Sequence, residues 1–417
     1  MAFNYEINQL ELMQARIKSV PHGWQFTYVG KAFCIRNNLR KPISEEERSM
    51  SPGNYPYYGP TKIQGYIGTF EQDGSYALIG EDGDHFLKFE KHSMTQLVDG
   101  KCTVNNHAHI IEGTKEASRE WFYYYFMHRD IFSFLSRQGA GRYKLNKASL
   151  EKMPLLLPPI VEQKKIAQIL STWDNAISVT EKLLANSQRQ KKALMQQLLT
   201  GNKRLLDENG VRFSREWKQV ELGDVFEKVS NGLTYDANSL DGLPVTRIET
   251  ISTGRVNFEK VGWAPDCDNT RRFKLNLGDI LYSHINSLEH IGRVAYFNDD
   301  KPLYHGMNLL LLRTKMQNNS LFLFHLLNSQ VGKKYAKTYA KSAVNQASIS
   351  TTDIKTFKVF IPERLEQQKI ASVLSAADAE ISTLEKKLAC LRDEKKALMQ
   401  QLLTGKRRVK VDEAVAV

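Results

Sequence analysis

Two stretches of the chain place an apolar residue at alternating steps of four and three. Counted from Ile166, seven of ten positions in this pattern are apolar within residues 162–201, and counted from Ile370, nine of ten are apolar within residues 366–405. A seam that repeats every 3.5 residues is typical of helices that pair as coiled coils. Each stretch follows a proline and ends at a glycine, Gly201 or Gly405, as many helices do. The pattern predicts two helices of about 40 residues, each roughly 60 Å long.

The apolar seam residues form the predicted interface of these helices, with each other or with a partner chain. They are Ile166, Leu170, Trp173, Ile177, Leu184, Leu194, Leu198, Ile370, Leu374, Ile381, Leu384, Leu388, Leu391, Leu398 and Leu402. Two seam positions carry lysine instead, Lys191 and Lys395, and we expect the helices to separate there.

The two stretches are copies of one sequence. At a constant offset of 204 residues, 25 of the 40 positions are identical, and the last eleven residues, KKALMQQLLTG, match without interruption. The approach to each stretch also matches, because residues 150–158 and 354–362 are both apolar, strand-like runs closed by proline. The start of each half is weakly similar, GWQFTYVGKAF against EWKQVELGDVF. Variable and near-constant segments therefore alternate along the chain.

This organisation predicts an α+β protein with two globular modules of mixed helix and strand and two long helices. The expected boundaries are 1–158 for the first module, 159–203 for the first helical segment, 204–361 for the second module, 362–407 for the second helical segment and 408–417 for a flexible tail. Each narrow seam needs a partner, and the nearest is the other copy in the same chain. With the modules at opposite ends, the helices would pair antiparallel and with pseudo-two-fold symmetry. An intermolecular coiled coil is the alternative.

Composition narrows the class of partner. The 417 residues suffice for two or three domains, and the net charge of +12 favours a polyanionic partner, with nucleic acid ahead of a membrane surface. No stretch approaches the 18 apolar residues of a spanning helix, and Glu6 and Glu11 stand where an export signal would be basic and then apolar. A cytoplasmic location is expected. The four cysteines are far apart without a CxxC pair, so we expect reduced thiols.

Polar loops of the first module carry side chains suited to nucleic acid. The segment YPYYGPTKIQGY, residues 55–66, combines aromatic, hydroxyl and cationic groups in a turn-rich stretch, and IRNNLRK begins in an apolar, strand-like run. Such groups can contact phosphates and base edges together, although loop packing or a solvated loop is an alternative for each segment. The proposed DNA-binding residues of this module are Arg36, Asn37, Arg40, Lys41, Tyr57, Tyr58, Thr61, Lys62, Asn106, His107 and Arg142.

The second module offers a similar set of polar loops. GDILYSHIN and IGRVAYF, which begin at Gly278 and Ile291, predict two strands around a polar loop, and HGMN precedes another apolar strand. Asparagine and arginine can read adenine and guanine edges through two hydrogen bonds, so these loops could carry sequence specificity. The proposed DNA-binding residues here are Asn231, Arg247, Ser283, His284, Asn286, His290, Arg293 and Asn308.

The sequence predicts neither a metal site nor an active site. His107, His109, His284 and His290 could be proposed as metal ligands, but there is no HExxH motif, no cysteine pair and no carboxylate at a fitting spacing. The phosphate-binding loop GxxxxGK[ST], the nucleophile motif GxSxG and the cofactor and Asn-Pro-Pro-aromatic motifs of adenine methyltransferases are also missing from the sequence. We expect no catalytic residue and no cofactor bound by this chain.

The duplicated EQxKIAxxLSxxDxxIS and KKALMQQLLTG segments resemble the specificity subunit of type I restriction-modification enzymes. The likeness extends over nearly the whole chain, because the order of variable and constant segments matches, and GDILYSHIN, IGRVAYF and HGMN resemble a target recognition domain of that family, as do YYGPTKIQGY and NNHAHI. Contacts to particular bases cannot be carried over to Tyr57 to Lys62, since recognition domains diverge in such loops.

The resemblance implies a non-catalytic subunit that places two target recognition domains on two half-sites of a split, asymmetric DNA sequence. It further implies two modification subunits held by the helices, which supply S-adenosylmethionine and methylate adenine, and restriction subunits that use ATP and Mg²⁺. If the helix pair fixes the separation of the modules, four residues added to either helix should lengthen the spacer between half-sites by one or two base pairs.

Three other readings of the sequence stay open. The first is a nuclease or methyltransferase whose motif has diverged, and the second is a scaffold whose modules bind protein. The third is a specificity subunit that serves methylation alone, without restriction subunits.

Overall fold

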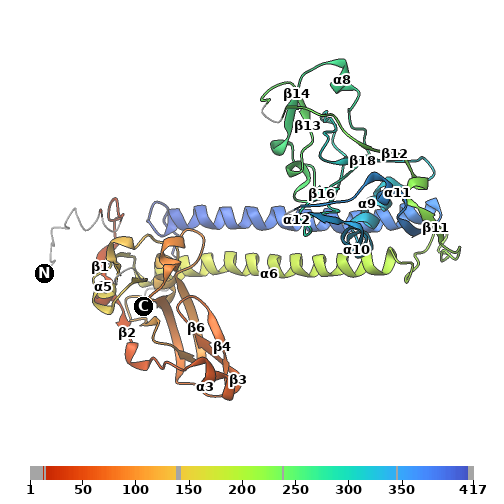
Figure 1. Ribbon diagram of the computed structural model, residues 1–417. Helices are drawn as coiled ribbons and strands as arrows, with labels where there is room; N and C mark the ends of the chain where they lie inside the picture. Colours follow the sequence, from red (N-terminus) through yellow and green to blue (C-terminus); the bar gives the residue numbers. More distant parts are fainter. Residues whose placement is uncertain (1–12, 14–15, 138–141, 237–238, 344–345, 412–417) are drawn as a thin grey trace. The chain divides into compact units, whose positions relative to one another are not determined.

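The computed structural model describes residues 13, 16–137, 142–236, 239–343 and 346–411 (Figure 1). The chain divides into two compact units. Unit 1 comprises residues 1–181 and 387–417, and unit 2 comprises residues 182–386. The predicted boundaries separate modules from helices, whereas each unit contains one module together with a part of both long helices. The reason is that the ends of the helices contribute to the cores of the modules.

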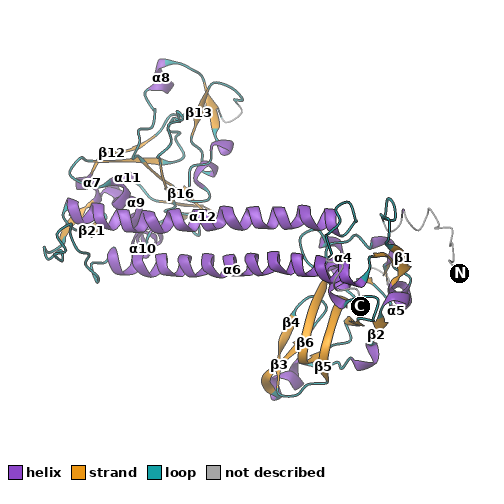
Figure 2. Cartoon of the chain, turned by 180° about the vertical axis from the view of Figure 1, so that it is seen from behind, coloured by secondary structure: helices purple, strands orange, loops and turns teal. Residues whose placement is uncertain are grey.

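The two long helices are α6 (Ile160–Leu198) and α12 (Arg364–Leu402). In each unit, a part of α6 lies beside a part of α12 (Figures 1 and 2). In unit 1, Lys395 Nζ lies 2.5 Å from Asp174 and Arg392 lies 2.6 Å from Glu181. Since residue numbers rise along one helix as they fall along the other, the helices run antiparallel there.

Unit 2 repeats this arrangement with the roles of the helices exchanged. Lys191 Nζ lies 2.5 Å from Asp378, and Ser187 Oγ donates a hydrogen bond of 2.8 Å to Glu380. Lys191 and Lys395 therefore bridge the helices through ion pairs, and the expectation that the helices separate at these lysines is wrong.

Burial along the seam is graded. Six seam residues near the helix ends are at most 2% exposed and pack into the cores of the modules, namely Ile166, Leu170, Leu198, Ile370, Leu374 and Leu402. Ile381 and Leu388 are 7% exposed. The other predicted seam residues are partly buried, namely Trp173, Ile177, Leu184, Leu194, Leu384, Leu391 and Leu398.

The module of unit 1 is built on a six-stranded sheet in the order β2-β7-β5-β6-β3-β4. Its strands are β2 (Cys34–Ile35), β3 (Pro52–Tyr58), β4 (Ile63–Ile67), β5 (Gln72–Gly80), β6 (Thr95–Val104) and β7 (Ala108–Glu112). Two strand pairs accompany it, β1 (Gln25–Tyr28) with β10 (Pro154–Leu157) and β8 (Ser136–Arg137) with β9 (Tyr143–Lys144). The helices are α2 (Val29–Ala32), α3 (Glu45–Met50), α4 (Arg119–Phe126) and α5 (Lys147–Glu151). The aromatic helix α4 contacts both β5 and β6, and its Trp121 and Phe122 are fully buried.

The module of unit 2 has a four-stranded sheet in the order β12-β18-β15-β17. Its strands are β12 (Phe226–Asn231), β15 (Ile280–Tyr282), β17 (Val294–Tyr296) and β18 (Leu310–Thr314). Smaller sheets are formed by β11 (Lys218–Glu221) with β21 (Lys358–Ile361), by β13 (Leu243–Val245) with β14 (Gly262–Ala264), and by β16 (Ile285–Asn286), β20 (Gln346–Ser348) and β19 (Lys341–Ala343). The helices are α7 (Leu222–Val225), α8 (Asp268–Arg271), α9 (Ser320–Asn328), α10 (Gln330–Tyr339) and α11 (Thr351–Lys355).

Both units use the same buried ion pair at the start of a long helix. In unit 1, the Glu162 side chain is 4% exposed, and the Arg408 guanidinium donates to its two oxygens at 2.7 and 2.8 Å. In unit 2, the Glu366 side chain is fully buried, and Arg204 donates to it twice at 2.6 Å. Both members of the second pair differ from the first by the repeat offset of 204 residues. The duplicated sequence therefore encodes a duplicated contact between the start of one long helix and the segment that follows the other.

A neighbouring glutamine repeats in the same way. The side-chain oxygen of Gln163 accepts a hydrogen bond of 2.8 Å from the backbone N–H of Ser118, the residue that caps α4. The side-chain oxygen of Gln367 accepts one of 2.9 Å from the N–H of Asn319, which caps α9. These bonds attach α4 and α9 to the long helices at corresponding points.

The expected flexible tail from residue 408 is wrong for its first residues. Besides its ion pair with Glu162, Arg408 donates to the backbone oxygen of His22 at 2.6 Å, and Val409 packs against the core of unit 1. Residues 412–417 lie outside the described part of the chain.

Two further observations concern the whole described chain. No described helix has the length and apolar content needed to cross a membrane. All four cysteines are free thiols, and Cys102 is buried whereas Cys34, Cys267 and Cys390 are exposed.

Candidate nucleic-acid interface

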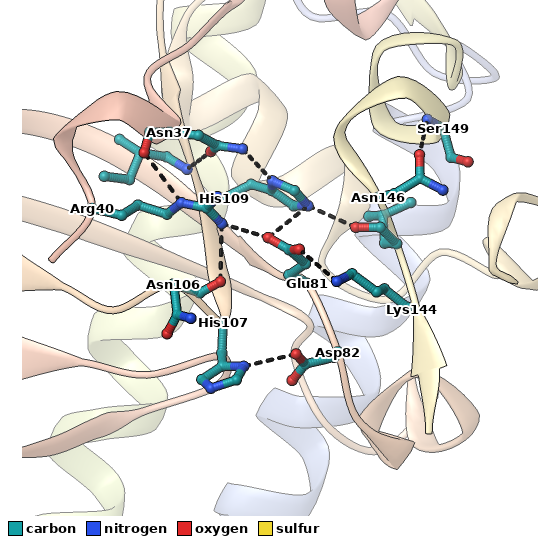
Figure 3. A network of polar contacts seen from close by, with 12 residues as sticks. Asn37, Arg40, Glu81, Asp82, Asn106, His107, His109, Lys144, Asn146 and Ser149 are labelled. Carbon is teal, nitrogen blue, oxygen red and sulfur yellow. Dashed lines mark hydrogen bonds and ion pairs between the residues drawn. The ribbon is translucent and has the colours of Figure 1, made fainter. Parts of the chain in front are cut away.

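Polar contacts join several of the predicted DNA-binding residues of unit 1 (Figure 3). The guanidinium of Arg40 donates to the backbone oxygen of Asn106 at 3.0 Å. His107 Nδ1 lies 2.7 Å from a carboxylate oxygen of Asp82. The N–H of Asn105 donates to the backbone oxygen of Tyr58 at 3.0 Å, which connects the β6–β7 turn to the end of β3. Segments that are far apart in the sequence thus meet around the turn of residues 105–107.

Glu81 is the centre of this network. Its side chain is 13% exposed, forms an ion pair with Arg40 and lies 3.2 Å from Lys144 Nζ (Figure 3). Burial alone would raise the pKa of the Glu81 carboxyl, but the hydrogen bond from Arg40 and the adjacent positive charges outweigh it, so the pKa falls below its ordinary value. Glu81 therefore stays ionised and fixes the position of Arg40 beneath the turn.

His109 supports the network from inside the module. It is 1% exposed, its Nδ1 lies 2.8 Å from Asn37 Nδ2, and its Nε2 lies 2.7 Å from the backbone oxygen of Leu145. The amide can only donate and the carbonyl can only accept, which assigns the proton to Nε2. Burial lowers the pKa of His109, in keeping with a neutral ring. Asn37 and Arg40 are thereby engaged within the protein.

Other predicted residues of this module lie at its surface. Lys62, Asn106, His107 and Arg142 are exposed, whereas Tyr58 and Thr61 are partly buried. Lys41 and Arg36 are about half exposed, and each forms an ion pair, with Glu71 and with Glu112 respectively.

The prediction of DNA contact is wrong for Tyr57. Its side chain is 2% exposed, its hydroxyl accepts a hydrogen bond of 2.9 Å from the N–H of Ile43, and the Arg48 guanidinium lies 4.8 Å from its ring centre. Tyr57 is a core residue that holds the segment after Lys41 against β3.

We expect Glu81→Gln to destabilise unit 1 by about 3 kcal/mol, because removing one partner from a mostly buried ion-pair network leaves charge without compensation. Glu71→Gln is the matched control, since the Glu71 and Lys41 side chains are 36% and 54% exposed and such pairs contribute at most about 1 kcal/mol. Urea unfolding of both variants measures the difference. Equal losses would show that Glu81 is no more important than a surface carboxylate.

In unit 2, the predicted polar loop closes on itself. The N–H of Ser283 donates to the oxygen of Arg293, and the N–H of Gly292 donates to the oxygen of Ser283, both at 2.8 Å. Ser283 and His284 are only 1% and 6% exposed, so the prediction that they contact DNA is wrong. They sit at the buried end of β15, and burial lowers the pKa of His284 to about 4.

The partly exposed members of this loop are Asn286, His290 and Arg293. The Asn286 amide donates to Ser283 Oγ at 3.0 Å. The Arg293 guanidinium donates to the backbone oxygen of Ser252 and lies 3.1 Å from His290 Nδ1. The loop thus presents an amide, an imidazole and a guanidinium from one short segment.

The remaining predicted residues of unit 2 belong to other segments. Asn231 is exposed at the end of β12 and pairs in register with Leu310, two residues beyond the partly buried Asn308. Arg247 lies 3.5 Å from Glu249. Within the described residues, no group of three or more histidine, cysteine or acidic side chains could hold a metal ion.

Sequence reasoning missed Glu81, Asp82 and Lys144. Glu81 and Asp82 directly follow the apolar strand that ends at Gly80, and acidic residues at the end of a buried strand were the available signal. Lys144 had no such signal, because its pairing with Glu81 depends on the tertiary fold.

The fold defines a class of protein with two dissimilar modules, each attached by a corresponding glutamine contact to long helices that run antiparallel within its unit. The chain belongs to the family described as type I restriction modification DNA specificity domain, which matches residues 21–186 and again residues 214–391. The two matched ranges coincide with the two halves of the internal repeat.

Similar proteins carry related names. The chain is 43% identical over 195 residues to a putative type I restriction enzyme MjaX specificity subunit of Methanocaldococcus jannaschii, a match that covers 45% of this chain and 46% of that protein. It is 25% identical over 426 residues to the type I restriction enzyme MjaVIII specificity subunit of the same organism, with 98% of each protein covered. Among solved structures, the S subunit of a type I restriction-modification system from M. genitalium has the same fold, with a TM-score of 0.64 and 14% identity over 93% of this chain and 97% of that one.

Proposed function

We propose that this chain is the DNA-reading subunit of a type I restriction-modification enzyme and that each module reads one half of a bipartite, asymmetric DNA sequence. The long helices hold two modification subunits, which supply S-adenosylmethionine and methylate adenine. Restriction subunits that use ATP and Mg²⁺ join the same assembly. The chain contributes recognition and spacing, and the chemistry belongs to its partners.

One observation carries this proposal. The contacts that attach the modules to the helices are duplicated, Gln163 with the N–H of Ser118 and Gln367 with the N–H of Asn319, whereas the modules have different sheets and different loops. A common attachment with unlike reading surfaces suits two different half-sites, and an asymmetric sequence needs two different readers.

The exposed groups of the modules fit nucleic acid. Lys62, Asn106, His107 and Arg142 in unit 1 are exposed, and Asn286, His290 and Arg293 in unit 2 are partly exposed. Together they offer cationic and amide groups to a ligand. Cations position the phosphates, and amides and guanidinium groups can read base edges.

Replacing residues 23–150 with the corresponding module of another family member is expected to change one half of the methylated sequence and to leave the other half and the spacer unchanged. Sequencing of genomic methylation in cells that carry the chimera measures this. The reciprocal exchange of residues 216–354 is the matched control and should change only the other half. A change in both halves from either exchange would contradict independent reading.

Two rival functions give different results. If the chain were a scaffold whose modules bind protein, the assembled complex would show no preference for a particular sequence over competitor DNA. If it were an enzyme, the purified chain with S-adenosylmethionine would methylate DNA without partners.

A further inference from the structure

A cationic cleft lies within unit 2, beside the loop that carries His290 and Arg293. The cleft has a volume of about 1490 Å³ and is lined by α10, by residues 252–256, by residues 289–293 and by facing side chains of α6 and α12. We propose that this α10 cleft binds the phosphate backbone of the DNA beside the half-site read by unit 2. This inference rests on the proposed function and assigns to the cleft a role separate from base reading.

Positive charge in the α10 cleft exceeds negative charge. Six lysine and arginine residues line it, against three acidic residues. Two of the six cations are already paired, Lys191 with Asp378 and Arg255 with Glu385. The other charges of the lining are Arg293 and three lysines of α10 against Glu289 and Asp299. Lys333, Lys334 and Lys337 project from one helix and form no ion pair within the described part of the chain. These three lysines are exposed and therefore available to an anion.

Burial and neighbouring cations disfavour the charged form of Lys333. The pKa of Lys333 lies below its ordinary value, first because of burial and then because of the positive charges of Lys191 and Arg293. These three cations come from α10, α6 and the loop at residue 293. A phosphate that entered between them would stabilise their positive charges. Repulsion between like charges would oppose the close packing of another cationic surface against the cleft.

The α10 helix is held firmly against the loop that carries His290 and Arg293. Gly292 has φ +78°, and a Cβ at this position would lie 2.3 Å from Cβ of Ala336 on α10. This close approach fixes the lysine face of the helix relative to His290 and Arg293, which line the same cleft. A backbone bound by the lysines would therefore pass next to the residues proposed to read bases.

One histidine that lines the cleft has a buried nitrogen without a hydrogen-bond partner in the described residues. His325 is 1% exposed, its Nε2 lies 3.3 Å from Ser375 Oγ, and its Nδ1 has no hydrogen-bond partner within the described residues. Burial lowers the pKa of His325 to about 4, so its ring is neutral at pH 7. If the serine hydroxyl donates to Nε2, then Nδ1 carries the proton, but this atom is buried beneath the lining and is not open to the cleft.

Unit 1 differs at the corresponding position. Six residues after the capping residue of α4 stands Tyr124, as His325 stands six residues after the capping residue of α9. The Tyr124 hydroxyl donates to Asp174 at 2.8 Å, so its polar group is already satisfied. The two units thus differ in the polar side chain that they place at this point.

Two features favour DNA over an acidic protein segment. Lys333 and Lys337 are one helical turn apart, and mobile ammonium groups suit successive phosphates of one strand, whereas a fixed carboxylate partner is more often recognised by the planar fork of arginine. The cleft also adjoins the proposed base-reading loop, where phosphate contacts would set the register of the protein on the duplex.

The test compares two triple variants of the full chain assembled with its modification subunits. One carries Lys333→Gln, Lys334→Gln and Lys337→Gln. The matched control carries Lys218→Gln, Lys355→Gln and Lys358→Gln, three exposed lysines of unit 2 that do not line the cleft. Affinity for a duplex that contains the methylated sequence is measured against salt concentration, with thermal unfolding as the check on folding.

We expect the cleft variant to bind about tenfold to a hundredfold more weakly at 0.15 M salt, and the slope of log K against log salt to become shallower by about two to three. The preference for the target over unrelated DNA and the map of methylated sites should stay the same, because bases are read elsewhere. The control variant should change the slope by less than about one.

Other results overturn the inference in distinguishable ways. An unchanged slope in a folded cleft variant would show that DNA does not occupy the cleft. Normal DNA binding with loss of the modification subunits would assign the cleft to an acidic protein surface. A wild-type complex without sequence preference would contradict the proposed function itself, and the inference with it.

Discussion

Ending the chain after Gly405 is expected to destabilise unit 1 by about 2 to 4 kcal/mol while leaving unit 2 close to its normal stability. The truncation removes Arg408, which donates twice to the almost fully buried carboxylate of Glu162, and Val409, which packs on the same core. A buried carboxylate without its partner is costly, although the 43% exposure of the Arg408 side chain reduces the loss through solvent screening.

Amide hydrogen exchange measures the loss of stability in each unit separately. Protection should fall in α4 and β10 after the truncation and remain in α9 and β21. A chain that ends after Val411 is the matched control, because it keeps both Arg408 and Val409. Loss of protection in both units, or in neither, would contradict the assignment of this segment to the core of unit 1.

Arg204→Ala makes the corresponding change in unit 2. Glu366 is fully buried and the Arg204 side chain is 19% exposed, so the loss should be the larger of the two, about 3 to 5 kcal/mol. Here protection should fall in α9 and β21. The two variants together test whether the duplicated contact stabilises each unit separately.

The long helices were predictable from the sequence, and their attachment to the modules was not. Apolar spacing and the flanking proline and glycine identified both helices to within a few residues. The repeated Glu-Gln pair at the start of each helix was visible, but its partners are remote. Glu162 binds an arginine 246 residues further along the chain, and no local pattern indicates such a contact.

The same limit applies to the candidate interface. Loop composition identified segments that do meet, such as Arg40 with the turn at Asn106. It could not show that Tyr57 and Ser283 point into the cores, because a tyrosine or serine beside a turn has the same local sequence whether it faces solvent or packs inside. Burial is decided by contacts between distant segments.

Two ion pairs change the expectation for the spacing of the half-sites. Asp174 and Lys191 are 17 positions apart along α6, and Asp378 and Lys395 are 17 positions apart along α12. Asp174 binds Lys395 within unit 1, and Asp378 binds Lys191 within unit 2. We expect an insertion into one helix alone to disturb one of these pairs rather than to lengthen the spacer, so the prediction for a single helix is replaced by one for both helices.

Seven residues inserted into both helices, after Lys182 and after Lys386, are expected to lengthen the preferred spacer by about three base pairs. One heptad keeps the apolar seam in phase and adds about 10 Å, and duplex DNA rises about 3.4 Å per base pair. Methylation at the original sequence should disappear, and methylation at the same two half-sites with the longer spacer should replace it, as measured by genomic methylation sequencing.

The single insertion after Lys182 is the matched control for this experiment. It adds the same residues but leaves α12 unchanged, so we expect one Lys–Asp pair to be disturbed. We expect loss of methylation at both spacers together with lower helix stability. If the double insertion kept the original spacer, the helix pair would not set the distance between the half-sites, whereas a new spacer from the single insertion would show that the ion pairs do not fix the register of the helices.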